Sequence, residues 1–284
     1  MSAASTALER FERWLDAQDD GLAVASFRRV FAAIWVVYDV IDLAWGMTER
    51  SRVWFPHDRS SGLLALQVVL VASGAMLGIG RYVWASGMVA AVARGAEAFL
   101  FFPLNDFFFA SVIYLLLAHS DGGPFAHESS AHGPSAHLED ADARRHDRRG
   151  PRWVRDALIF QLGWIYLATG VLKMNPDWLD GGQLFVRTQY LATSHGWPYP
   201  APLARALASL AFDAKLSMIG AASEIALGAF MLARGPYWAA ALLAAAVHGF
   251  GALVTNVWFF PASMAAGVFL LLPRSRRDGE GGSR

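Results

Sequence analysis

Long runs of apolar residues, separated by short polar segments, dominate the pattern along this chain. Most of the runs approach the roughly 20 residues that an α-helix needs to cross the hydrocarbon core of a bilayer. The last run is short and carries Pro261, so we expect it to be tilted or partly interfacial. The pattern predicts an all-α, polytopic transmembrane helical bundle whose eight spans lie at about 27–45, 61–79, 82–102, 105–118, 154–174, 211–233, 237–254 and 257–272.

The composition agrees with a membrane protein. Of the 284 residues, 55% are hydrophobic, which is more than the share in an average soluble domain. The absence of cysteine excludes disulfides, thiolate nucleophiles and thiolate metal sites. The 24 basic and 24 acidic residues cancel, so the charge gives no indication of a nucleic-acid partner. We therefore expect membrane lipids as partners, and no nucleic acid.

Polar segments frame the predicted spans. Residues 1–25 are charged and lack the apolar core of a signal peptide, which predicts a cytoplasmic N-terminal segment. Residues 119–152 form a hydrophilic loop, residues 175–205 an amphipathic interfacial cap, and residues 274–284 a charged C-terminal tail. The loop histidines match no metal-ligand spacing, so we predict a solvated loop and no metal site. They are His127, His132, His137 and His146.

The basic residues predict the orientation of the chain. With both termini in the cytoplasm, the arginine-rich end of the loop and the arginines of the C-terminal tail lie on the cytoplasmic side. This arrangement satisfies the positive-inside rule. We expect an integral protein of the bacterial inner (plasma) membrane with N-terminus and C-terminus inside.

Each ionisable side chain within the predicted spans requires a structural or functional explanation, because a charge at bilayer depth costs about 2.5–3.5 kcal/mol on insertion scales. Arg94 and Glu97 stand at i, i+3, so an internal ion pair that fixes helix packing is the favoured interpretation. A structural role is also favoured for Asp39. For Glu224 and His248, structural and functional interpretations both stay open.

Lys173 is the most informative single residue. The chain contains only two lysines, Lys173 and Lys215, and Lys173 ends a membrane-length apolar run. Lysine can lose its proton in dry surroundings, whereas arginine does not. Tyr166, Thr169 and Gly170 share a helix face with Lys173 at i, i+3, i+4 and i+7, which suits a lined cavity. The alternative is an interfacial amine that snorkels to the membrane surface.

Several short motifs carry a family resemblance. Residues 166–181 contain Gly-x-x-Lys ending at Lys173, then Asp177-Trp178 and Gly181, with Gln161 five positions before Tyr166. These motifs resemble the signature of the HTTM domain, the membrane domain of the vitamin K-dependent γ-carboxylase-like family. Three further stretches agree with the family in order and spacing, so that the resemblance covers most of residues 25–275. They are Asn105-Asp106, Asp121, and His248 with the following Phe260-Pro261.

The resemblance implies a single HTTM-like transmembrane domain over residues 26–273 and a cofactor. The cofactor is a reduced quinone of the vitamin K or menaquinol kind, acting with O2 and CO2. Lys173 would be the base that deprotonates it. The implied catalytic residues are Lys173, Asp106 and His248. The implied cofactor-binding residues are Asn105, Tyr166, Thr169, Gly170 and Trp178.

Three features depart from the carboxylase pattern. Asp106 replaces a family histidine, and Leu172 stands where the carboxylase has a second lysine. The residues after Pro273 hold no counterpart of the carboxylase's large lumenal domain. We therefore do not expect carboxylation of a propeptide-bearing protein, although the quinol-handling half of the chemistry can survive.

Three functions compete. The first is an integral-membrane enzyme that uses a reduced quinone and a lysine base to drive carboxylation or oxidative modification of a peptide or small substrate. The second is a non-enzymatic binding or transport protein whose polar residues line a pathway. The third is an assembly partner for another membrane complex. A site for a quinone at Lys173 would favour the enzyme, and a pore past Asp39, Glu97 and Glu224 would favour transport.

Overall fold

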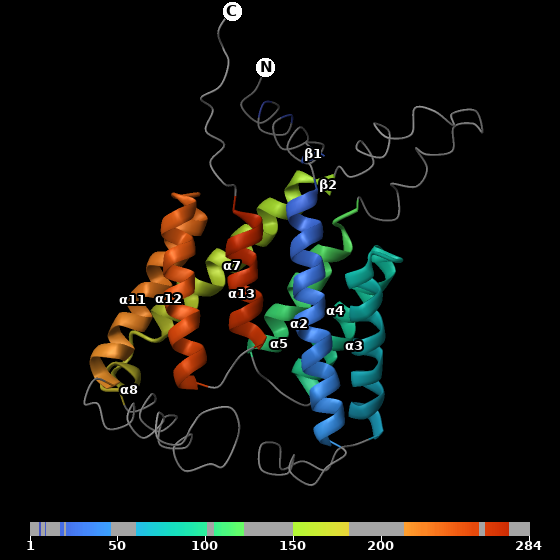
Figure 1. The fold of residues 1–284 in the computed structure, drawn as a ribbon, viewed down its shortest axis with the longest axis horizontal. Helices are drawn as coiled ribbons and strands as arrows, with labels where there is room; N and C mark the ends of the chain where they lie inside the picture. The colour runs from blue at the N-terminus through green and yellow to red at the C-terminus, as the bar shows by residue number, and fades with distance from the viewer. Residues whose placement is uncertain are drawn as a thin grey trace, which may run out of the picture. The chain divides into compact units, whose positions relative to one another are not determined.

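The computed structural model describes residues 6, 9, 18–19, 21–46, 61–100, 105–121, 150–181, 213–255 and 259–272. This part of the chain is helical apart from short turns and a two-stranded bridge between β1 (Gln18–Asp19) and β2 (Gly150–Pro151). The helices are α2 (Leu22–Gly46), α3 (Ser61–Ile79), α4 (Val83–Leu100), α5 (Asn105–Ala118), α7 (Arg152–Leu172), α8 (Pro176–Leu179), α11 (Asp213–Leu232), α12 (Tyr237–Thr255) and α13 (Phe259–Leu271) (Figure 1).

Each of the eight predicted spans coincides with a helix, and the predicted all-α class is confirmed for the described residues. Two helices are long and apolar enough to cross a membrane, over Gly62–Ile79 in α3 and Lys215–Leu232 in α11. Only 33% and 28% of these two windows are buried, so their apolar side chains mostly face outward, unlike those of a soluble core helix. The two helices support a membrane location, while crossing by all eight helices stays a prediction.

The chain forms two compact units, Met1–Leu158 and Ile159–Arg284. The division falls within α7, whose first turns belong to unit 1 and whose remainder belongs to unit 2. The predicted single domain over residues 26–273 therefore contains two separately packed regions. Most of the predicted loop and cap, and all of the C-terminal tail, lie outside the described residues.

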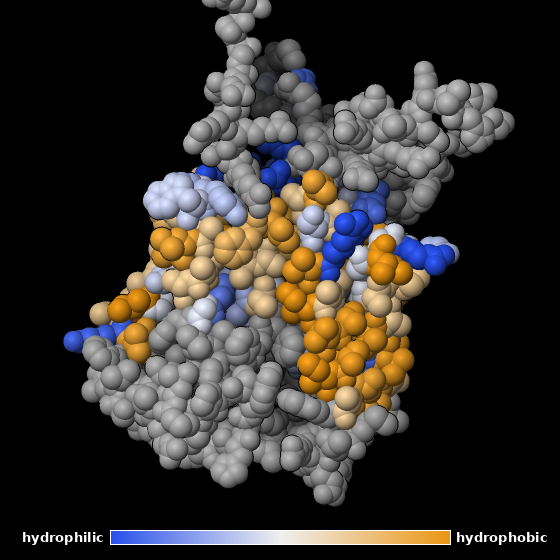
Figure 2. Space-filling view, in the orientation of Figure 1, coloured by the Kyte–Doolittle hydropathy of each residue, from blue (hydrophilic) through white to orange (hydrophobic). Residues whose placement is uncertain are grey.

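Unit 1 is built from α2 to α5, in which α2 packs on α3, α3 on α4 and α4 on α5. Phe27, Phe31 and Trp35 recur every four residues on α2, so they share one face, and all three are buried. Tyr114 of α5 meets Phe31 edge-on at 5.1 Å between ring centroids. Figure 2 shows a broad apolar surface over α3, and Phe99 of α4 is 86% exposed. Such a surface suits lipid better than water.

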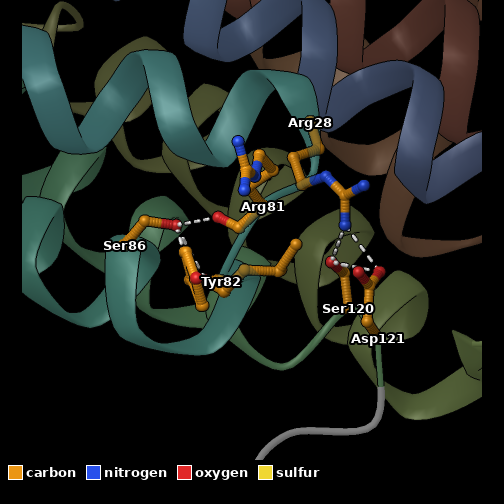
Figure 3. A network of polar contacts seen from close by, with 7 residues as sticks. Arg28, Arg81, Tyr82, Ser86, Ser120 and Asp121 are labelled. Atoms are coloured by element: carbon orange, nitrogen blue, oxygen red, sulfur yellow. Dashed lines mark hydrogen bonds and ion pairs between the residues drawn. The ribbon is translucent and has the colours of Figure 1, made fainter.

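One end of unit 1 is held together by polar contacts (Figure 3). Arg28 of α2 donates to Ser120 Oγ at 2.9 Å and to Asp121 Oδ1 at 2.5 Å, both just beyond α5. Gly150 lies against the same corner, because an added Cβ would come within 2.7 Å of the Ser120 carbonyl oxygen. Gly80, with φ +79°, ends α3 beside Arg28. The starts of α2 and α7 and the end of α5 therefore meet.

The described basic residues of unit 1 are concentrated at this end, with Arg94 as the exception. Arg28, Arg81 and Arg152 lie at the corner just described, and Arg29 and Arg155 lie within a turn of it. A cluster of arginines at one end of a bundle is what the positive-inside rule expects of a cytoplasmic side. The arrangement is consistent with the predicted orientation, which stays a prediction.

Unit 2 contains the rest of α7 together with α8, α11, α12 and α13. Helix α11 packs on α8 and α12, and α12 packs on α13. Helices α7 and α11 approach so closely that an added Cβ on Gly228 would lie 2.5 Å from the Leu167 nitrogen. On Gly170 it would lie 2.8 Å from the Ile225 nitrogen. Small residues at such positions let helix backbones touch in a membrane.

Candidate active site at the end of α7

Lys173 follows the last residue of α7, and its backbone N–H still donates to the Thr169 carbonyl at 3.1 Å. Asn175 then turns the chain, because its Nδ2 donates to the Leu172 carbonyl at 2.6 Å and its Oδ1 accepts from the Trp178 N–H at 3.0 Å. Pro176 occupies the first turn of α8, where the missing N–H costs nothing. This local sequence therefore fixes the backbone on both sides of Lys173.

The amine of Lys173 forms an ion pair with Glu224 of α11, at 2.5 Å between Nζ and Oε1. The Lys173 side chain is 27% exposed and that of Glu224 is 14% exposed. The Trp178 ring lies 5.0 Å from Nζ, a cation–π distance, and its Nε1 donates to the Ser217 carbonyl of α11 at 3.3 Å. Helices α7, α8 and α11 thus converge on one amine.

Glycines explain why Glu224 reaches Lys173. Gly170 lies three residues before the lysine and contacts the α11 backbone at Ala221 and Ile225, on either side of Glu224. A larger residue there would hold the two helices apart and lengthen the Lys173–Glu224 distance. The close helix contact therefore sets the geometry of the ion pair.

The second oxygen of Glu224 lacks a partner among the described residues, as does Ser217 Oγ on the same helix. Oε2 is buried and has no hydrogen-bond partner among the described residues. A carboxylate offers about four lone-pair sites, and leaving a buried one unused costs free energy. Such an oxygen is a ready acceptor for a hydroxyl or amide of a ligand.

A second polar pair lies deeper on the same helix. Tyr166 Oη hydrogen-bonds His248 Nε2 of α12, and the two rings lie 5.5 Å apart with a 51° tilt. Tyr166 is buried, and His248 is half-buried. Lys173 acts electrostatically on His248, and Glu224 acts on Tyr166. The two pairs therefore form one polar cluster within unit 2.

Comparison with known families bears on this cluster. The family described as the HTTM domain matches residues 135–275. This stretch of the chain is similar to an HTTM domain. The HTTM domain is a membrane domain of the vitamin K-dependent carboxylase family, so the predicted resemblance is confirmed over residues 135–275, while its extension to residues 25–134 stays a prediction. No curated protein and no solved structure matches the chain.

The HTTM domain contains the whole polar cluster of unit 2. Tyr166, Lys173, Glu224 and His248 all lie within residues 135–275. Of the predicted catalytic residues, the structure brings Lys173 and His248 into the same cluster. Sequence reasoning left Glu224 open between structure and function and did not pair it with Lys173. The available signal was a carboxylate inside one apolar helix and a lone amine at the end of another.

Two predicted cofactor-binding residues have packing roles that the sequence did not reveal. The Thr169 hydroxyl donates to the Ile165 carbonyl of its own helix at 2.8 Å. Gly170 is buried against α11. Both support the HTTM site by shaping α7, whereas Tyr166 and Trp178 present polar or aromatic groups to the cluster. Their part in cofactor binding stays a prediction.

The other predicted site residues lie in unit 1. Asn105 and Asp106 open α5, and their side chains lie outside the described part of the structure. Their role in the HTTM site is therefore untested. Within the described residues, no group of three or more His, Asp or Glu side chains could hold a metal ion.

The charged residues of unit 1 form a closed cluster. Arg94 donates through Nη1 to Glu97 at 2.5 Å, which confirms the predicted i, i+3 ion pair. Its Nη2 also donates to both oxygens of Asp39 at 2.7 Å. The Trp35 and Phe107 rings cover the guanidinium at 4.5 and 5.2 Å. This arrangement favours a structural role for Asp39 and Glu97 over a transport pathway.

Proposed function

We propose that this protein is an integral-membrane enzyme that binds a reduced quinone beside Lys173 and Glu224. The enzyme uses the quinone to drive carboxylation or oxidative modification of a peptide or small substrate. The observation that carries the proposal is the Lys173–Glu224 pair, because it joins a partly buried amine to a carboxylate whose second oxygen has no hydrogen-bond partner among the described residues, within the stretch that matches the HTTM domain.

The residues around the pair fit a reduced quinone. Its ring hydroxyls need an acceptor and its ring oxygens need a donor, and Glu224 Oε2 and Lys173 Nζ supply these groups. Trp178 adds an aromatic face. Val171 and Leu172, next to the lysine, are exposed and apolar, which suits the entry of a lipid-soluble ligand from the bilayer.

The chemistry divides between the cofactor and the chain. By the family resemblance, a bound reduced quinone would supply, with O2, the strong base needed to remove a proton from carbon before CO2 is added. A ring hydroxyl must first lose its proton. The atom of the chain that accepts this proton is Lys173 Nζ or Glu224 Oε2. Tyr166 and His248 keep a second hydrogen-bonded pair close to these atoms. Partial burial strengthens these electrostatic contacts.

The direct test is mass spectrometry of the lipids that co-purify with the full-length protein. We expect menaquinone or a related quinone with the wild type and its loss in Lys173→Ala. Lys215→Ala is the matched control, because Lys215 is the other lysine, is exposed and lies in the same domain. Circular dichroism must show that both variants keep their helices. Equal quinone content in Lys173→Ala and wild type would contradict the proposal.

A further inference from the structure

We infer that two turns of the chain bind the phosphate of an anionic phospholipid, a lipid whose headgroup carries a net negative charge. The α3–α4 turn comprises residues 79–84, and the α11–α12 turn comprises residues 233–238. The inference goes beyond a general contact with membrane lipids, because it names the class of lipid and the residues that hold it. It does not depend on the proposed quinone chemistry.

The first observation is the position of the two turns along the chain. Each follows directly on one of the two helices that are long and apolar enough to cross a membrane, Gly62–Ile79 in α3 and Lys215–Leu232 in α11. A run of this length spans the hydrocarbon core, so its end lies close to the level of the lipid headgroups. In the predicted orientation both turns lie on the cytoplasmic side, where anionic lipids give the membrane surface a negative potential.

The second observation is that the two turns carry the same kinds of side chain. Arg81 and Arg234 are both exposed. Exposed aromatic residues follow each arginine, Tyr82 and Trp84 in the first turn and Trp238 in the second. The planar arginine fork matches the oxygens of a phosphate, and tyrosine and tryptophan rings settle at headgroup level. Each turn therefore offers a cation and an aromatic ring to the same lipid layer.

The third observation is the backbone conformation of the turns. Tyr82 has a φ of +51° and Arg234 a φ of +52°, and no other non-glycine residue among those the structure describes has a positive φ. This conformation is strained for a residue with a Cβ. The Tyr82 carbonyl accepts from the Ser86 N–H at 2.8 Å and from Ser86 Oγ at 2.9 Å, which fixes the turn (Figure 3). Each turn thus keeps a large side chain where glycine would be unstrained, as ligand-binding segments do.

The charge of Arg81 is not neutralised within the described part of the chain. Arg28 lies beside the same turn, since an added Cβ on Gly80 would come 3.1 Å from its Nη2, but Arg28 is paired with Asp121 at 2.5 Å. Arg81 has no acidic partner there, and its guanidinium lies 5.9 Å from the centre of the Tyr82 ring. An exposed cation at the end of the apolar surface of α3 matches a phosphate that carries acyl chains better than a free anion (Figure 2).

Native mass spectrometry of the full-length protein, released from nanodiscs, counts the lipids that stay bound. The nanodiscs contain equal parts of anionic phosphatidylglycerol and zwitterionic phosphatidylcholine with identical acyl chains. Loss of one phosphate-binding cation should weaken headgroup binding about fivefold. We therefore expect Arg81→Gln and Arg234→Gln each to retain about one phosphatidylglycerol fewer than the wild type, with unchanged phosphatidylcholine.

Two further variants separate the turns from charge in general. Lys215→Gln is the matched control, because it removes one positive charge from an exposed side chain of α11 outside both turns. It should retain as much phosphatidylglycerol as the wild type. Tyr82→Gly removes the ring and the backbone strain together, so it should lower phosphatidylglycerol retention while thermal stability stays equal or rises.

The outcomes decide each turn separately. A turn whose glutamine variant retains as much phosphatidylglycerol as Lys215→Gln does not bind the lipid, and the inference fails for that turn. Unchanged retention in Tyr82→Gly would show that the strained tyrosine has no part in lipid binding. Quinone content should equal that of the wild type in Arg81→Gln and Arg234→Gln, so failure of this inference leaves the proposed function standing, and the reverse also holds.

Discussion

Each unit contains one charged cluster, and the two clusters differ in burial and in the number of acidic partners around the cation. Arg94 in unit 1 is fully buried and binds Asp39 and Glu97, which are each 1% exposed, under a cover of aromatic rings. Lys173 in unit 2 has one acidic partner within ion-pair distance among the described residues, keeps 27% exposure and leaves an oxygen of Glu224 unused. The first cluster is fully buried, and the second is partly exposed.

The chemistry of the two cations matches this difference. The arginine fork holds its charge and can bind two carboxylates at once, which suits a fixed structural element. The lysine ammonium is a compact charge that can exchange one anionic partner for another. The fully buried Arg94 cluster stabilises the helix packing around it, whereas the partly exposed Lys173–Glu224 pair is the better candidate for binding a ligand. This comparison leads to three predictions.

The largest expected effect is on the stability of unit 1. Arg94→Met would leave Asp39 and Glu97 buried without their cation, so we expect a loss of about 3–5 kcal/mol of unfolding free energy. Lys173→Met should cost clearly less, because water reaches that pair. Unfolding by SDS in mixed micelles measures both.

Two controls sharpen the Arg94 experiment. Arg81→Met should change stability by no more than about 0.5 kcal/mol, because Arg81 is exposed and has no acidic partner among the described residues. Adding Asp39→Asn and Glu97→Gln to Arg94→Met should recover part of the loss. An Arg94→Met protein as stable as the wild type would show that the triad is dispensable.

An intermediate effect is expected where α7 meets α11. Gly228→Ala would place a Cβ 2.5 Å from the Leu167 nitrogen, so the helices must move apart at a cost of about 1–3 kcal/mol. The movement should also reduce quinone content by weakening the Lys173–Glu224 contact. Gly220→Ala on the same helix is the matched control.

We expect the control variant Gly220→Ala to raise stability, whereas Gly228→Ala should lower it. Gly220 has no atom within 4 Å of an added Cβ, so the alanine should stabilise α11 by about 0.5–1 kcal/mol. Thermal unfolding and quinone mass spectrometry report the two effects. If the two variants had the same stability and the same quinone content, the close contact between α7 and α11 would not be what positions Lys173 against Glu224.

The smallest expected effect is at Tyr166. Tyr166→Phe removes the hydroxyl that hydrogen-bonds His248 and should cost about 1 kcal/mol of stability. Quinone should still co-purify, since Lys173 and Glu224 are unchanged. Tyr237→Phe at the start of α12 is the control, because the structure shows no hydrogen bond of its hydroxyl within the described residues. Complete loss of quinone in Tyr166→Phe would place the tyrosine in direct contact with the ligand.

The helices were predictable because an apolar run is a local property. The run at residues 61–79 has the same bounds as α3, and the run at 105–118 has those of α5. The Arg94–Glu97 pair was predictable for the same reason, since residues three apart on a helix are neighbours. These predictions required no knowledge of how the helices pack.

The partners from other helices were not predictable in this way. Asp39 joins Arg94 across 55 residues, Glu224 joins Lys173 across 51, and His248 joins Tyr166 across 82. The sequence marked most of these side chains as costly in a membrane without indicating which would meet. Hydropathy carries no information about the rotation of one helix against another.

The amino-acid sequence by itself determined the helical class, the positions of the helices and the HTTM resemblance, and it singled out Lys173 as the candidate base. Only the tertiary structure decided that this amine lies against Glu224 and that the second carboxylate oxygen has no partner among the described residues. The physical reason is contact at the helix surfaces. Gly163, Gly170 and Gly228 let the α7 and α11 backbones touch, and this contact sets which polar side chains come within hydrogen-bonding distance.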